Sequence, residues 1–168
     1  MESSVASGLH VGTAGLLLAM GSAAGIVVRV WFGHLADGMG GGRLRLVAAM
    51  LGVGVVGFVM LASGQVSLIL PGTLLAFGAG WGWPGLFNFA VVKTNPGAPA
   101  AATGITQTGA SGGAALGPLV FGLLVEATSY GVAWLVCGAI AATALVAILA
   151  GRAMILRDRA RVSGESPG

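Results

Sequence analysis

The chain contains long stretches without a charged side chain. No Asp, Glu, Lys or Arg occurs inside the three stretches that are delimited by Arg45, Lys93, Glu126 and Arg152. About 20 apolar residues suffice to cross the hydrocarbon core of a bilayer, and each stretch is longer than that. Charged residues make up 8% of the chain, against about 25% in typical soluble domains. These stretches predict a membrane protein and exclude an ordinary soluble domain.

The uncharged stretches and the residues that break them predict an all-α, polytopic membrane protein with five transmembrane helices. Helices are expected because lipid offers backbone groups no other hydrogen-bond partner. Residues 63–65 and 95–99 carry glycine or proline and predict turns between spans. We expect one transmembrane domain over residues 1–168, with spans at residues 9–32, 46–62, 66–92, 104–125 and 132–150 and a cytoplasmic tail at 151–168.

The basic residues predict how the chain is oriented. All eight Lys and Arg fall around the first or third connection or after the last span, and none lies in the N-terminal tail or the second or fourth connection. Short loops rich in Lys and Arg stay in the cytoplasm. We therefore expect a multi-pass protein of the plasma (inner) membrane, with the N-terminus outside and the C-terminus cytoplasmic. Basic residues in these positions favour contact with the lipid bilayer, and we expect no binding of nucleic acid.

The fourth predicted span has two distinct faces. Glycines recur every four residues and form a flat stripe, which another helix can approach closely, at Gly109, Gly113 and Gly117. At 100° per residue the opposite face carries polar side chains, namely Gln107, Thr108 and Ser111. This polar face either bonds to a neighbouring helix or lines a water-filled path, and the sequence leaves both open. Gly21 and Gly25 repeat the glycine spacing in the first span.

The third predicted span carries a second candidate set. Trp81, Pro84 and Asn88 share one helical face, and the proline can free backbone carbonyls on that face. These side chains either form a pocket or pack against a neighbour, and both interpretations stay open.

Two motifs resemble those of the major facilitator superfamily. Gly33 and Asp37 have the spacing of the Gly-x-x-x-Asp element in that family's cytoplasmic signature, with Arg29 before it and Arg43 after a glycine-rich turn. The fourth span is similar to the glycine-proline signature of antiporters in the family, with Phe121 where a further glycine is expected. Its matching positions are Gly104, Gly113, Gly117, Pro118 and Gly122.

The resemblance implies a place in a two-bundle transporter. The family's two six-helix halves are repeats, so the chain matches helices two to six or helices eight to twelve. The third span lacks the arginine usual on helix four, which favours helices eight to twelve. Alternating access needs two bundles around a central site. We therefore expect a partial chain, whose partner is the missing N-terminal half, that transports a small solute; the alternative is a non-transporting scaffold or an inactive fragment.

The resemblance also assigns roles to residues. The expected substrate path consists of Trp81, Asn88, Gln107, Thr108 and Ser111. The expected cytoplasmic gate consists of Arg29, Gly33, Asp37 and Arg43. The expected helix-packing residues are Gly109, Gly113, Gly117 and Pro118.

The sequence lacks residues that the enzymatic functions suggested by its motifs would require. Gly109 to Gly112 spells the Gly-x-Ser-Gly of rhomboid-type intramembrane proteases, but no histidine follows Ser111 to serve as the base that a serine nucleophile needs. The glycine-rich turn after Asp37 lacks the Gly-Lys-Ser/Thr of a phosphate loop. A single cysteine, Cys137, excludes an internal disulfide and a cysteine-rich metal site. We expect no catalytic residue, no metal and no cofactor.

Asp37 yields a testable prediction. By resemblance, its carboxylate contacts the N-terminus of the fourth span, where a negative charge gains about 0.3–1 kcal/mol, and it latches the cytoplasmic side shut. The alternative is that it caps the loop or neutralises Arg29. In a complete transporter, Asp37→Asn should largely abolish transport while protein level and solute binding stay near normal. Transport at the parental rate would contradict the latch.

Overall fold

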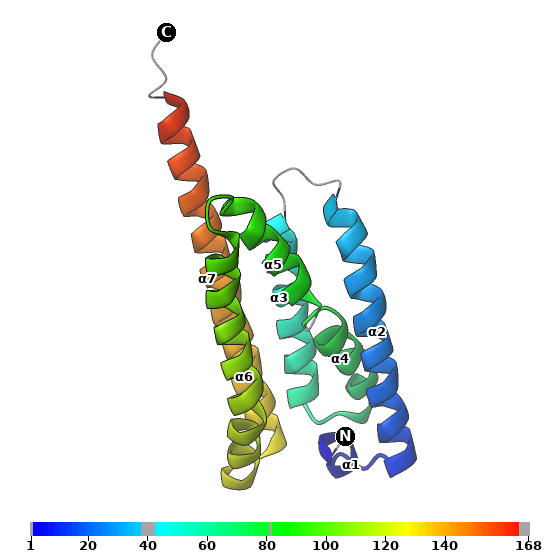
Figure 1. Cartoon of the computed structure of the whole chain (residues 1–168). Coiled ribbons are helices and arrows are strands. Elements are labelled where there is room, and N and C mark those ends of the chain that lie inside the picture. Colours follow the sequence, from blue (N-terminus) through cyan, green and yellow to red (C-terminus); the bar gives the residue numbers. More distant parts are fainter. Residues whose placement is uncertain (1, 38–42, 81, 165–168) are drawn as a thin grey trace.

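The computed structural model describes residues 2–37, 43–80 and 82–164, without the side chains of residues 36, 37, 159 and 162–164. The described part is all-helical and confirms the predicted fold class (Figure 1). Its helices are α1 (Glu2–Ala6), α2 (Val11–Asp37), α3 (Arg43–Ala62), α4 (Val66–Gly78), α5 (Trp83–Thr94), α6 (Pro99–Ala127) and α7 (Tyr130–Gly164). Five segments of this part are long and apolar enough to cross a membrane.

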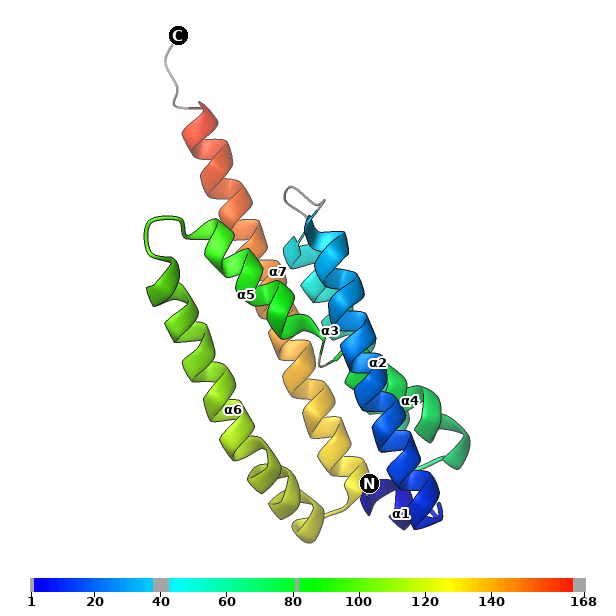
Figure 2. The same ribbon diagram turned by 45° about the vertical axis from the view of Figure 1, so that its right-hand side comes forward.

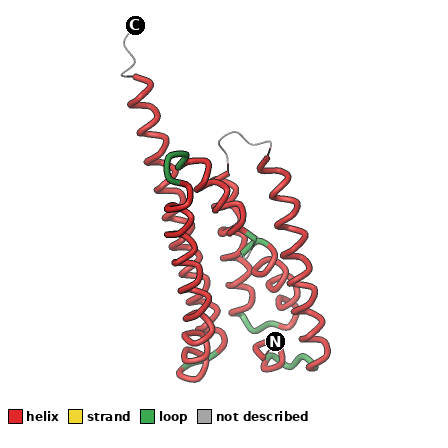
Figure 3. Tube along the Cα trace, viewed as in Figure 1, coloured by secondary structure: helices red, strands yellow, loops and turns green. Residues whose placement is uncertain are grey.

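The helices gather the basic residues at one end of the bundle. The C-terminal part of α2, the start of α3, the connection from α5 to α6 and the second half of α7 lie together at this end, which we call the basic end (Figure 1). The N-terminal helix α1, the turn from α3 to α4 and the turn from α6 to α7 lie at the opposite end, and Figure 3 shows how short these two turns are. This arrangement agrees with the alternation of spans expected from the sequence.

The third predicted span is not one helix. It consists of α4 and α5, which are separated by a break between Gly78 and Trp83. Glycine has a low helix propensity, and the break contains Gly80 and Gly82. Pro84 lies in the first turn of α5, where its missing N–H costs nothing. The span expected at 66–92 therefore consists of two shorter helices in line.

α3 is the central helix of the bundle, in contact with α4, α5 and α7. Its glycines allow a very close approach to the broken span. A Cβ atom added at Gly57 would lie 2.5 Å from the backbone nitrogen of Ala76, and one added at Gly54 would lie 2.7 Å from the Cα of Gly80. Small residues at such crossings let helices in lipid gain van der Waals contact. The break in the third span is thus packed directly against the α3 backbone.

The glycine pair of the first span packs in the same way. A Cβ atom added at Gly21 would lie 3.0 Å from Cγ2 of Thr73, and one added at Gly25 would lie 3.1 Å from the carbonyl oxygen of Phe77. Both neighbours belong to α4. The predicted packing role of Gly21 and Gly25 is confirmed.

α6 differs from the other long helices because it lies at the edge of the bundle (Figure 2). It contacts α5 and α7, yet every residue from 107 to 120 is exposed. A Cβ atom added at Gly109, Gly113 or Gly117 would meet no atom within 4 Å, and Pro118 is exposed beside them. None of the described helices packs on the predicted glycine stripe, so its packing role stays a prediction.

The last helix extends past the end of its apolar run. The predicted tail is helical through Gly164, because Arg, Ala, Met and Leu, which dominate the residues after 150, all favour the helix. A change in composition marks where a helix leaves the lipid, and the helix itself can continue into water.

The contrast between occupied and open glycines predicts a difference in stability. Gly57→Ala should lower the free energy of unfolding by about 1–3 kcal/mol, because the new methyl group overpacks the contact with α4. Gly113→Ala adds the same group in open space and should cause no loss. Unfolding of the purified chain by titration with sodium dodecyl sulfate measures both. Equal stabilities for the two variants would contradict the packing described here.

Candidate solute path and gate

Asn88 joins α5 to α6 through its side-chain amide. Its Nδ2 donates a hydrogen bond to Oε1 of Gln107 at 3.3 Å, and the Thr106 hydroxyl donates to its Oδ1 at 3.0 Å. Both ends of the half-buried Asn88 amide are therefore satisfied by α6, as groups at membrane depth require. This polar contact holds the N-terminal part of α6 against α5.

Thr106 is a member of this contact that the sequence analysis missed. Its hydroxyl also lies 2.9 Å from the carbonyl oxygen of Thr103, so one proton serves two acceptors. The signal was present as two threonines three residues apart, Thr103 and Thr106, of which Thr106 falls on the glycine face of α6 at 100° per residue. Residues so spaced are neighbours on a helix surface.

The other predicted path residues of α6 make no hydrogen bond to the described residues of α5. The Thr108 hydroxyl donates to the carbonyl oxygen of Gly104 in its own helix at 2.9 Å, and both Thr108 and Ser111 are exposed. Trp81 lies outside the described residues. The structure thus joins Asn88 and Gln107 and leaves Thr108 and Ser111 on an exposed surface. Of the two interpretations of the polar face, a bond to a neighbouring helix applies to Gln107, and the lining of a water-filled path stays open for Thr108 and Ser111.

Aromatic rings hold the far end of α6. Phe121 packs edge-on against Trp134 of α7, with 4.9 Å between ring centroids. Trp134 also stacks on Phe58 of α3 at 6.0 Å, and its indole N–H donates to the Ser3 hydroxyl at 2.9 Å. Phe121 occupies the position where the antiporter signature has a glycine, and here it anchors the helix. α6 is therefore held at both ends while its middle stays free.

The predicted gate residues meet around Phe89 at the basic end. Arg29 and Gly33 line a cavity of about 300 Å³ between α2 and α5, and Phe89 lines it from the α5 side. The guanidinium carbon of Arg43 lies 4.7 Å from the centroid of the Phe89 ring, within the range of a cation–π interaction. Asp37 is the last residue of α2, and its side chain lies outside the described part, so the latch stays a prediction.

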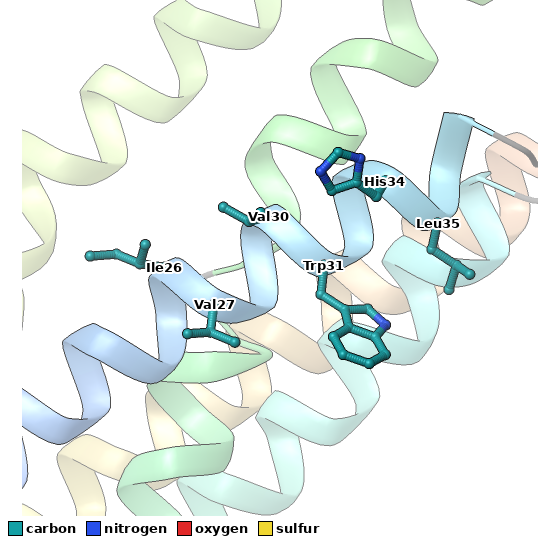
Figure 4. Close-up of a pocket in the computed structure, with 6 residues that line it drawn as sticks. All are labelled: Ile26, Val27, Val30, Trp31, His34 and Leu35. Carbon is teal, nitrogen blue, oxygen red and sulfur yellow. The ribbon is translucent and has the colours of Figure 1, made fainter.

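A second hollow, of about 650 Å³, lies on α2 alone. Figure 4 shows its six side chains projecting from successive turns of that helix, in two rows on either side of it. The lining residues are Ile26, Val27, Val30, Trp31, His34 and Leu35. It is an apolar surface groove with one histidine at its edge, which lacks the convergent polar groups of a solute site. Among the described residues, no group of three His, Cys, Asp or Glu could hold a metal ion.

The fold and site define a multi-pass helical membrane protein with a polar contact between two of its spans. The family model of the Major Facilitator Superfamily matches residues 3–167, and the chain belongs to this family of membrane transporters. No curated protein and no solved structure matches the chain.

The contact between α5 and α6 yields a prediction for a double-mutant cycle. Asn88→Ala and Thr106→Ala should show a coupling energy of about 0.6 kcal/mol and at most ~1.7 kcal/mol, the range measured for hydrogen bonds between membrane helices. Thr108→Ala is the matched control, because its hydroxyl bonds only within α6. Its effect should add to that of Asn88→Ala within about 0.5 kcal/mol. Additive losses for Asn88 and Thr106 would contradict the contact.

Proposed function

We propose that this chain is part of a secondary transporter that moves a small solute by alternating access, and that it supplies helices eight to twelve of the family's plan. The observation that carries the proposal is the middle of α6. It is exposed on every side from residue 107 to residue 120, although it is a candidate membrane span.

The two faces of α6 suit two different surroundings. Polar side chains within a membrane tend to face the interior of a bundle or a water-filled cavity, and Thr108 and Ser111 are polar, exposed and without a hydrogen bond to the described part of α5. The glycine stripe suits a close helix crossing and has no such neighbour among the described helices. A complementary bundle outside this sequence would cover the stripe and enclose the polar face, which is the arrangement that alternating access needs.

Asn88 and Gln107 have a structural part in this proposal. Their hydrogen bond fixes the N-terminal part of α6 relative to α5. The polar face that carries Thr108 and Ser111 is thereby held in a defined position. We assign solute recognition to Thr108 and Ser111, which are exposed and make no hydrogen bond to the residues described in α5, and to Trp81.

The gate in this proposal lies at the basic end. Arg29 and Gly33 line one cavity together with Phe89, and Arg43 lies against the ring of Phe89. Asp37 at the end of α2 would close this side against the start of α6, and would open it when the two bundles rock. The absence of arginine from α4 and α5 supports the placement as helices eight to twelve.

The path has a direct test. In a complete transporter with Cys137 replaced, Ser111→Cys should react with a small hydrophilic thiol reagent, because a thiolate forms only where water has access. Ile140→Cys on α7 is the matched control: Ile140 lies inside an uncharged stretch and is 64% exposed, and its thiol should stay unreactive in lipid. Addition of a transported solute should slow the reaction at Ser111→Cys. Equal reactivity of the two cysteines would contradict a solute path along α6 and would favour a non-transporting scaffold.

We also propose that the chain lies in the plasma membrane and that its basic end faces the cytoplasm. The placement of all basic segments at one end supports it. Gly64→Cys and Ser129→Cys, in the turns of the opposite end, should be labelled in intact cells by a membrane-impermeant reagent. Gly97→Cys, in the connection from α5 to α6, should be labelled only after lysis. Labelling of Gly97→Cys and Gly64→Cys from the same side would contradict five spans.

A further inference from the structure

Two cations share one aromatic ring at the basic end. The Arg43 guanidinium lies 4.7 Å from the Phe89 centroid and the Lys93 ammonium lies 5.8 Å from it. Arg43 begins α3 and Lys93 is in the last turn of α5. A cation–π interaction contributes only modestly at an exposed site, while two like charges held by one ring repel each other. The cluster therefore carries a positive charge that the ring does not neutralise.

The described residues supply no anion to this cluster. Nε of Arg43 is buried and has no hydrogen-bond partner. The first turn of α3 contains no acidic residue, and a cation at the start of a helix is disfavoured by the helix dipole. Helix stability therefore does not explain Arg43 at this position. A buried donor without a partner is costly, so hydrogen bonding among the described residues does not explain Arg43 either.

The surroundings of the cluster suit an amphiphile. The cavity on the α2 side of the Phe89 ring has apolar side chains from Phe32, Leu86 and Phe89 itself, with Arg29 as the one charged residue among the described residues of its lining. Lys93 ends the uncharged stretch that begins after Arg45, and Arg43 lies two residues before Arg45. Both are at the level where long basic side chains reach the headgroup region. Charge and apolar surface thus meet at the boundary of the membrane.

We propose that Arg43 and Lys93 bind the phosphate of an anionic phospholipid, with its glycerol and upper acyl chain against Phe89 and the adjoining cavity. The shared chemistry is a phosphate oxyanion. Arginine can present two N–H donors in a fork to it, and lysine adds a point charge. The lipid is favoured over a soluble phosphate because the apolar walls continue from the cations. This proposal goes beyond the proposed transport function, with which it shares Arg43, and lipid binding is measured without transport.

Binding of lipid to the purified 168-residue chain tests the site. Native mass spectrometry in neutral detergent would compare phosphatidylglycerol with phosphatidylcholine. The double variant Arg43→Gln, Lys93→Gln should weaken binding of phosphatidylglycerol about tenfold, since both basic residues lie near the membrane surface. The matched control Arg157→Gln, Arg161→Gln removes the same charge from exposed positions of α7 and should change binding little. The exchange Arg43→Lys with Lys93→Arg should retain most of it.

Further measurements distinguish a bound lipid from a soluble anion and from a general surface charge. Phe89→Leu keeps the apolar volume but removes the ring, and should give a smaller loss of phosphatidylglycerol binding even if the double variant does not fold. Inorganic phosphate or glycerol phosphate in excess should not displace the lipid; displacement by either would overturn the lipid in favour of a soluble anion. Equal losses in the double variant and the α7 control would overturn the site and leave only a general surface charge. Equal binding of both lipids would do the same.

Discussion

The structure depends on the close approach of helix backbones at α3. In a bilayer the hydrophobic effect does not drive helices together, because lipid tails are as apolar as leucine. Association then depends on van der Waals contact, which small residues increase. Gly54 and Gly57 place the α3 backbone against Gly80 and Ala76 so closely that one added methyl group would collide. The broken third span is held in this way, and α5 is thereby positioned to present Asn88 to α6.

By the same criterion of close helix packing, α6 differs from the other spans. α3 and the first span use their glycines against a neighbouring helix, whereas the glycines of α6 face open space. The helix is secured by an amide and a hydroxyl near one end and by Phe121 and Trp134 near the other. A span held at both ends with both faces of its middle free is a surface suited to a moving partner. This difference between the packed glycines of α2 and α3 and the open glycines of α6 links the packing to the transport function that we propose for this chain.

Much of the fold follows from composition alone, and the reason is physical. Lipid allows only helices, so uncharged length determines the spans, and all five were predicted in order. The break before Pro84 was not predicted, because a proline in a long apolar run can mark either a kink or a new helix start. Apolar length reports the membrane boundary and not the end of a helix, so the span expected at 132–150 did not show how far α7 continues. In the site, Asn88 and Gln107 were named as path residues, a role that stays a prediction. Their direct hydrogen bond and the part of Thr106 depend on how two helices cross.

The central claim is that the free middle of α6 faces a second bundle. Disulfide cross-linking in a complete transporter tests it most directly, with Cys137 replaced and with cysteines placed in turn along the helices of the complementary bundle. We predict that Gly113→Cys forms cross-links with that bundle and that Ile140→Cys on α7 forms none. Failure of Gly113→Cys to cross-link with any position of the other bundle, while Ile140→Cys does so, would contradict this claim.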